Sequence, residues 1–254
     1  MKKYRLVIVI LLILVILPVK VLFDTPRKGY SIEPRADKIT ELDNNSTSLI
    51  ILGWLRVEGT NIDYPIVYKN LYSDNDNVDY LWSLSLASDL RDLRNRMVIY
   101  GHNLRNVSSK PILNDSSLVR FEQLMYFTDY NFAKENQFIQ LTIDGKDELY
   151  KIYGAAFVSA TMDSGEYTET KEETDKYIKD ALQKSIYNYH TDVNADDKII
   201  SLITCTRFFG IQSDVSQFRI DARKVRENEK AINSRVTKSS NYGIIEKIIG
   251  GNNE

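Results

Sequence analysis

The chain has a single cysteine, Cys205, and two histidines, His102 and His190. One cysteine cannot form a disulfide within the chain, so Cys205 is either a small buried side chain or a free thiol with a chemical role. One thiol and two histidines far apart in the sequence do not provide the ligand set of a zinc site. The sequence therefore predicts no metal centre.

A strong charge of one sign is also missing. The formal net charge is −2, and the body of the chain has no long run of like charge. A basic face for nucleic acid is therefore not expected. The glycine patterns G-x-G-x-x-G and G-x-x-x-x-G-K-[ST], which cradle phosphate groups, do not occur either. We expect no nucleic-acid partner and no bound cofactor.

The chain contains one long apolar run, from Leu6 to Phe23, and Lys2, Lys3 and Arg5 precede it. At about 1.5 Å per residue this run nearly crosses a hydrocarbon core of roughly 30 Å. No small-residue cleavage site follows, which favours an uncleaved signal-anchor over a removed signal peptide or a buried helix. The preceding basic residues predict a single-pass membrane protein with residues 1–23 as tip and anchor, its N-terminus in the cytoplasm and the rest outside.

About 230 residues follow the anchor, enough for one large domain. Residues 24–48 are predicted to form a spacer and a helix over Arg35–Asn44. Further helices are expected at 115–125, 129–135 and 172–187, the last with Thr170 and Glu173 at capping-box spacing. Predicted strands are a hairpin within 51–68 that turns at Glu58-Gly59, and runs at 96–100, 138–143, 148–158, 198–204 and 217–225.

Short strands with inserted helices indicate a mainly β fold, a closed, antiparallel-rich barrel over residues 49–226. A turn at Asp144-Gly145 supplies a second hairpin. Residues 227–254 are predicted as a polar tail, in which "YGIIEKIIG" is either a short amphipathic helix or a frayed end.

Cys205 ends a strand-like run, "SLITC". A thiol becomes a nucleophile when it is ionised beside a cation or an imidazole and reaches solvent. His102 follows another predicted strand in "MVIYGHN", where Gly101 allows a sharp turn; His190 lies in a polar connection typical of a solvated histidine. His102 is the preferred partner of the thiol, although a strand-end histidine bonded to backbone would leave the same pattern.

An anionic intermediate of acyl transfer needs donors aimed at its charge, and a guanidinium is a strong one. Two arginines follow the thiol: Arg207 in the next loop and Arg219 in the strand "QFRIDARKV". Alternation along that strand places Arg219 on the opposite face from Phe218 and Ile220. Arg219 is preferred and Arg207 stays the second candidate, while a solvated arginine on the strand face is the structural alternative.

Taken together, "GWLRVEGTNIDYPIV", "YGHN", "SLITC" and "FRIDARKV" behind an N-terminal anchor resemble a sortase, most closely class B. Residues 201–205 match the family's Thr-Leu-x-Thr-Cys strand except for serine in the first place. The resemblance spans roughly residues 45–226 and includes a helical insert at 172–187 similar to the class B insert beside the substrate groove.

The resemblance implies a role for each matching residue. Cys205 would be the nucleophile, His102 the general acid and base, and Arg219 the clamp for oxyanion and substrate. Three further residues would contact substrate: Tyr100, Thr204 and Ile203. Class B members often carry serine where this chain has Ile203.

The resemblance also implies a hydrolase-type thiol peptidase that works as a transpeptidase. It would cleave exported proteins after the threonine of a C-terminal sorting motif, of the Asn/Ser-Pro-x-Thr-x type in class B, and join them to an amine of cell-wall peptidoglycan. Two alternatives remain: an enzyme that polymerises pilin subunits, and a non-catalytic membrane-tethered binding or scaffold protein with the same barrel.

Overall fold

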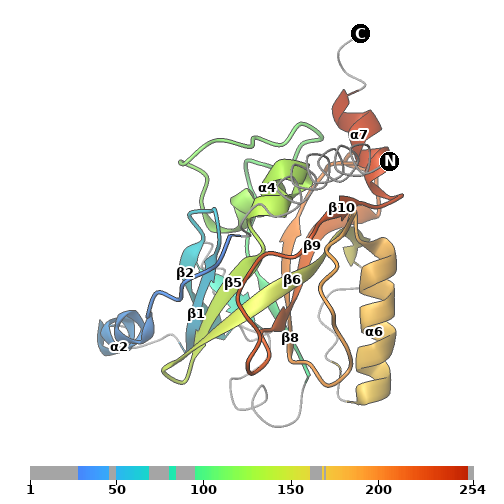
Figure 1. Ribbon diagram of the computed structural model, residues 1–254. Coiled ribbons are helices and arrows are strands. Elements are labelled where there is room, and N and C mark those ends of the chain that lie inside the picture. The colour runs from blue at the N-terminus through green and yellow to red at the C-terminus, as the bar shows by residue number, and fades with distance from the viewer. Residues whose placement is uncertain are drawn as a thin grey trace, which may run out of the picture.

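The computed structural model describes residues 28–45, 50–68, 80–83, 95–160, 168 and 170–250. In this part of the chain eight strands close into a barrel in the order β1-β2-β3-β4-β8-β9-β6-β5 (Figure 1). The strands are β1 Ile51–Val57, β2 Asp63–Tyr68, β3 Leu81–Ser83, β4 Arg96–Tyr100, β5 Phe138–Ile143, β6 Lys146–Ser159, β8 Ile199–Cys205 and β9 Val215–Lys224. The predicted mainly β, closed barrel is confirmed.

Most neighbouring strands are antiparallel, and two pairs are parallel: β2 with β3, and β4 with β8. The β5–β6 hairpin turns at Asp144 and Gly145, whose φ angles of 53° and 70° fit a two-residue turn with both central residues left-handed. The parallel β4–β8 pair matters most for function, because the two strands end side by side.

Alternation along the strands separates the barrel interior from its outer face. On β8, Ile200 and Leu202 belong to the main core, whereas Ser201 lies on the outer face and bonds to Asp221. On β9, Phe218 and Ile220 point inward in the same way. Arg219, which lies between Phe218 and Ile220, is therefore on the outer face, as Ser201 is.

Helix α6, Lys171–Lys184, covers part of the outer face beside β6 (Figure 1). Its predicted capping box is present: the Glu173 amide donates to Thr170 Oγ1 at 3.2 Å, and the Thr170 amide donates to Glu173 Oε2 at 3.1 Å. Ile178 and Ala181 pack against Tyr153 of β6. The helix ends earlier than predicted, since Tyr187 lies in the short strand β7, Tyr187–Asn188.

The other helices agree with the sequence in place and differ in detail. Helix α2 spans Ala36–Asn45 and α4 spans Tyr130–Glu135. The helix predicted at 115–125 is instead the 3₁₀ segment η1, Arg120–Thr128, which is buried along nearly all its length. Its i to i+3 winding suits a short connector that is held by tertiary packing.

The segment predicted as a polar tail is part of the packed domain. Strand β10, Thr237–Lys238, pairs with β7, and α7 spans Tyr242–Gly250. Val236, Tyr242 and Ile245 join the main core. The "YGIIEKIIG" stretch is therefore a helix, and the core extends beyond the predicted boundary at residue 226.

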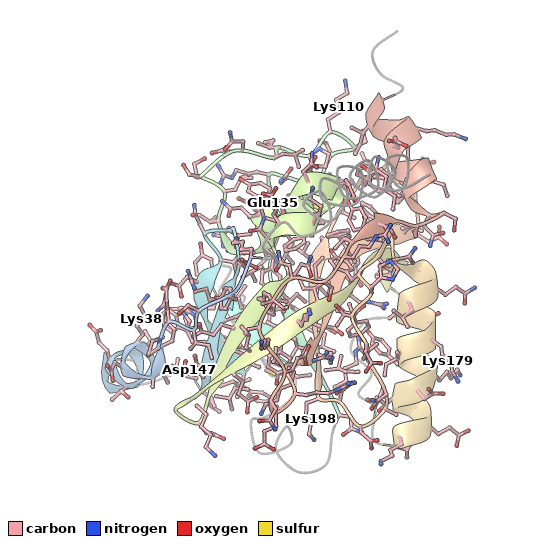
Figure 2. The ribbon with its side chains drawn as sticks, in the orientation of Figure 1. Lys38, Lys110, Glu135, Asp147, Lys179 and Lys198 are labelled. Carbon is pink, nitrogen blue, oxygen red and sulfur yellow. The ribbon has the colours of Figure 1, made fainter. Side chains whose placement is uncertain are left out.

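The predicted membrane anchor lies outside the described residues. No helix among the described residues is long and apolar enough to span a bilayer. Charged side chains point outward from many parts of the surface, as Figure 2 shows for Lys38, Lys110 and Lys179.

Candidate active site

A cavity of about 420 Å³ opens where β4 and β8 end, and Cys205 and His102 both line it. Cys205 is the last residue of β8 and is exposed. Arg207 and Gln217 also line the cavity. The thiol therefore reaches solvent and shares its cavity with an imidazole, which are two requirements of a nucleophilic cysteine.

The sheet register explains why these two residues meet. In the parallel β4–β8 pair the last matched residues are Tyr100 and Ile203. His102 and Cys205 each follow two positions later, so both continue along the same side of adjacent strands. Residues more than a hundred positions apart are thus brought together by backbone pairing.

Close packing and two backbone hydrogen bonds hold His102 just beyond the end of β4. A side chain at Gly101 would place its Cβ within 2.7 Å of Phe121 and Leu81, so only glycine fits. The Gly101 amide donates to the Ile203 carbonyl at 3.2 Å, and the Phe121 amide donates to the His102 carbonyl at 3.2 Å. The backbone on each side of His102 is therefore fixed to β8 and to η1.

Asn103 connects the segment after β4 directly to the cysteine. Its buried side-chain amide donates to the carbonyl oxygens of Cys205 at 3.1 Å and Asn106 at 2.8 Å. Its Oδ1 accepts the Asn106 amide at 2.9 Å. One side chain thus sets the distance between the backbones that carry the thiol and the imidazole.

An aromatic row supports the imidazole. The ring of Trp82 lies 4.7 Å from that of His102 and stacks on Tyr100 at 5.9 Å between centroids. Trp82 was not predicted as a site residue; its signal is weak because β3 is only three residues long. The row contributes to the position of His102 through ring contacts.

Glu122 holds the loop that follows His102. It is 1% exposed, its Oε1 accepts the Arg105 amide at 3.1 Å, and its Oε2 lies 2.9 Å from the Arg105 guanidinium. Burial acts to raise the pKa of the Glu122 carboxyl, but the Arg105 hydrogen bond and the Val119 amide outweigh it and hold that pKa below its usual value. The charged form of Glu122 is therefore favoured in the folded state.

The loop after Cys205 is anchored by aromatic packing. Phe208 is buried, and its ring lies 4.6 Å from Phe157 of β6. The Arg207 amide donates to the Val107 carbonyl at 2.8 Å, and the Gly210 amide closes a turn onto the Arg207 carbonyl at 2.9 Å. Arg207 is therefore an exposed residue on a fixed backbone, and it forms part of the cavity wall.

Arg219 is not brought to this cavity. It is fully buried on the outer face of β9, and its Nε donates to Asp221 Oδ2 at 2.8 Å. Its guanidinium also lies 5.1 Å from the ring centroid of Tyr177 of α6. Asp221 pairs with Ser201, further from the end of β8, so the guanidinium of Arg219 turns away from Cys205.

The predicted substrate contacts are also placed outside the lining of the cavity. Ile203 and Thr204 are 1% and 2% exposed, and the Thr204 hydroxyl donates to the Gly101 carbonyl at 2.7 Å. Tyr100 is half-buried against Trp82. His190, the other histidine, is exposed, and its Nε2 lies 3.3 Å from Thr237 Oγ1. Of the predicted site residues, Cys205 and His102 line the cavity, and so does Arg207, the second arginine candidate.

The residue that faces Cys205 across the β8–β9 pair is Gln217. Sequence reasoning missed it, although it has the same strand parity as Arg219 and stands two positions earlier. Among the described residues, no group of three or more histidine, cysteine, aspartate or glutamate side chains could hold a metal ion.

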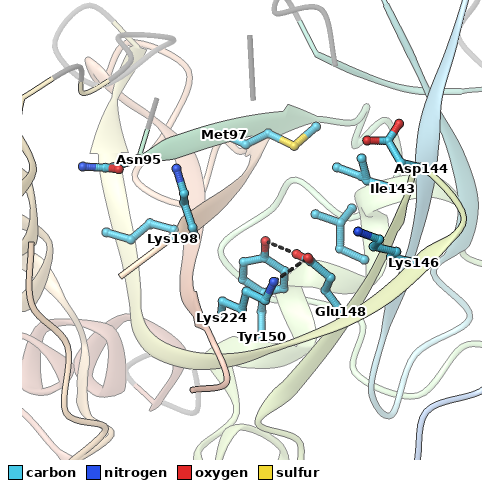
Figure 3. A pocket seen from close by; sticks show the side chains of 11 residues that line it. Asn95, Met97, Ile143, Asp144, Lys146, Glu148, Tyr150, Lys198 and Lys224 are labelled. Carbon is cyan, nitrogen blue, oxygen red and sulfur yellow. Dashed lines mark hydrogen bonds and ion pairs between the residues drawn. The ribbon is translucent and has the colours of Figure 1, made fainter. Parts of the chain in front are cut away.

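A second cavity, of about 320 Å³, lies at the opposite end of the barrel, near the start of β8 and the end of β9 (Figure 3). Lysines 146, 198 and 224 line it together with Glu148 and Tyr150. Glu148 already accepts the Tyr150 hydroxyl at 3.1 Å and pairs with Lys224. This cavity holds no thiol or imidazole.

Two curated proteins are similar to this chain in sequence. No protein-family model matches the sequence. The chain is 27% identical to sortase B of Listeria monocytogenes over 66% of its own length and 67% of that protein. It is 22% identical to sortase B of Staphylococcus aureus over 61% of its length and 63% of that protein.

A solved structure is also similar to this chain in fold. The X-ray structure of Clostridium perfringens sortase B superposes with a TM-score of 0.58 at 23% identity, covering 74% of this chain and all of that one. The chain is similar to sortase B in sequence and in fold. It spans 63%, less than two thirds, of the length of S. aureus sortase B.

Proposed function

We propose that this chain is a class B-like sortase, a cysteine transpeptidase. It cleaves an exported protein after the threonine of a C-terminal sorting motif and joins the new end to an amine of peptidoglycan. The observation that carries the proposal is the shared cavity of an exposed Cys205 and His102 on a barrel with the sortase B fold.

The reaction has two steps. The Cys205 thiolate attacks the carbonyl carbon of the threonine, and the carbonyl π electrons move to its oxygen. When the tetrahedral species collapses, the C–N bond breaks, His102 protonates the leaving amine, and a thioester remains. An acceptor amine then attacks the thioester, gives its proton to His102, and releases Cys205.

The scaffold alternative is disfavoured by the exposure of the thiol. A structural cysteine is normally buried and inert, whereas Cys205 is exposed at the end of its strand. The hydrogen bonds of Gly101 and Asn103 fix the backbone around His102 to β8, and His102 lines the same cavity as the thiol. Packing alone does not require a free thiol at this position.

Membrane anchoring through residues 1–23 is part of the proposal. It would hold the cavity near the membrane, where exported proteins and lipid-linked wall precursors are both found, and so raise their effective concentration. The support for it is the basic-then-apolar order of the sequence.

The test is mass spectrometry of Cys205 after incubation with a library of peptides that contain Pro-x-Thr. A mass increase equal to the acyl fragment ending in threonine is expected, and Cys205→Ala should form none. Addition of a peptidoglycan amine should remove the adduct and yield the ligated peptide. Unreacted Cys205 with every peptide, in a folded protein whose thiol still reacts with iodoacetamide, would contradict the function.

A further inference from the structure

We propose that the side-chain amide of Gln217 is the donor that stabilises the oxyanion formed when Cys205 attacks a carbonyl. This inference rests on the proposed acyl transfer at Cys205. It gives Gln217 the oxyanion-stabilising role that the sequence predicted for Arg219.

The sheet register places Gln217 directly opposite the nucleophile. Cys205 and Gln217 are the last matched pair of the antiparallel β8–β9 ladder. Residues opposite each other in such a ladder point to the same face, with Cβ atoms about 4.5–5.5 Å apart. A glutamine side chain spans the remaining distance to an oxygen atom bonded to the carbon under attack.

Gln217 also lines the cavity that contains Cys205 and His102. It is half-buried, and its Oε1 is buried without a hydrogen-bond partner. No hydrogen bond joins the Gln217 side chain to any residue in the described part of the chain. A primary amide carries two N–H donors, so Gln217 keeps donor capacity at the mouth of the thiol site.

Arg219 and Asn103 are not placed to serve as this donor. Arg219 directs its Nε to Asp221, on the side away from Cys205. The Asn103 amide donates to the carbonyls of Cys205 and Asn106. Arg207 is exposed and extends from the following loop, which makes it the comparator for Gln217.

Side-chain amides are suited to this task. An oxyanion-hole donor must lie 2.7–3.1 Å from the developing oxyanion, and asparagine or glutamine can serve. Attack by Sγ forms the S–C bond and transfers the carbonyl π pair to oxygen, where the Gln217 N–H donates a hydrogen bond. Collapse restores the carbonyl and expels the amine, which His102 protonates. Gln217 gains and loses no proton.

The test compares Gln217→Ala and Gln217→Glu with the matched variant Gln212→Glu. Gln212 is exposed in the same loop region and does not line the cavity. Each folded protein is treated with p-nitrophenyl acetate, whose attack by the thiol forms an oxyanion, and with iodoacetamide, whose alkylation forms none. Acylation and alkylation of Cys205 are followed by intact mass.

We expect Gln217→Ala and Gln217→Glu to lower the acylation rate by about 10²–10³-fold, the usual effect of removing one oxyanion donor. Alkylation should stay near the wild-type rate, and Gln212→Glu should change neither. The assignment would be overturned if Gln217→Ala were acylated at the wild-type rate. It would also be overturned if the variant lost acylation and alkylation rates equally. A large acylation loss in Arg207→Ala with none in Gln217→Ala would transfer the role to Arg207.

Failure of the wider function gives a different result. If the wild type reacts with p-nitrophenyl acetate and with no sorting peptide, the transpeptidase proposal fails, while the comparison of Gln217 variants still reads out the oxyanion donor.

Discussion

The hydroxyl of Thr204 donates to the carbonyl oxygen of Gly101 at 2.7 Å and so connects the strand that carries the nucleophile to the residue before His102. Thr204 points into the barrel, one residue before Cys205. Thr204, which the family resemblance implies as a substrate contact, is therefore a buried residue that joins the two strands behind the cavity.

Thr204→Val should destabilise the fold by about 1–3 kcal/mol, because the buried Gly101 carbonyl loses its partner. Urea unfolding measures the loss. Thr204→Ser, which keeps the hydroxyl, should restore most of it. Equal stability of the valine variant and the wild type would show that this bond contributes little.

Asn103→Ala should slow acylation of Cys205 by a peptide or ester by about 10–100-fold, since small displacements of reacting groups have effects of that order. The reason is the loss of the bridge to the Cys205 and Asn106 carbonyls. Single-turnover mass spectrometry measures the rate, and the pH profile should change shape if His102 is displaced. Ser108→Ala, at an exposed position of the same loop, serves as control.

Arg219→Ala should lower the free energy of unfolding by about 3–5 kcal/mol, because Asp221 would keep a buried charge without its ion-pair partner. Arg207→Ala, at an exposed position, should stay within about 0.5 kcal/mol. Urea unfolding gives both values. An Arg219→Ala protein of wild-type stability that has lost acylation would return Arg219 to the catalytic role.

Glu122→Gln should make the fold less stable at neutral pH and remove one source of acid sensitivity. The folded-state pKa of Glu122 lies below its ordinary value of 4.5, so its contribution is full above that value and is lost as the pH falls through the folded pKa. Urea midpoints between pH 7 and pH 3 should converge for wild type and Glu122→Gln at the acid end. Glu135→Gln, exposed on α4, provides the control, and parallel curves would contradict the role of Glu122.

Local signals predicted much of the barrel. The turns at Glu58-Gly59 and Asp144-Gly145 located two hairpins, because turn residues with positive φ constrain the chain locally. The short strands β3, β7 and β10 were missed, since they are defined by distant partners rather than by their own pattern. The 3₁₀ winding of η1 was missed because tertiary packing around this buried segment, and not its own sequence, decides it.

The site was predicted in part. The order of His102 and Cys205 at two strand ends was enough to pair them, and the parallel register places both at one cavity. Strand parity gave the face of Arg219 but not the direction of its long side chain, which Asp221 decides from two residues away. Gln217 has the same parity and no such neighbour to engage it.

The β4–β8 ladder makes the position of the sulfur depend on the number of residues in β8. A single insertion or deletion within Ile199–Cys205 would exchange the two faces of β8 and carry the sulfur into the packed interior, with Thr204 outside in its place. Beyond the anchored residues Arg207 and Phe208, the largely exposed part of the next loop, residues 210–214, lies outside the ladder and can vary in length without moving sulfur or imidazole. Variation in this protein's close kin should therefore concentrate in that loop and avoid the strand before it.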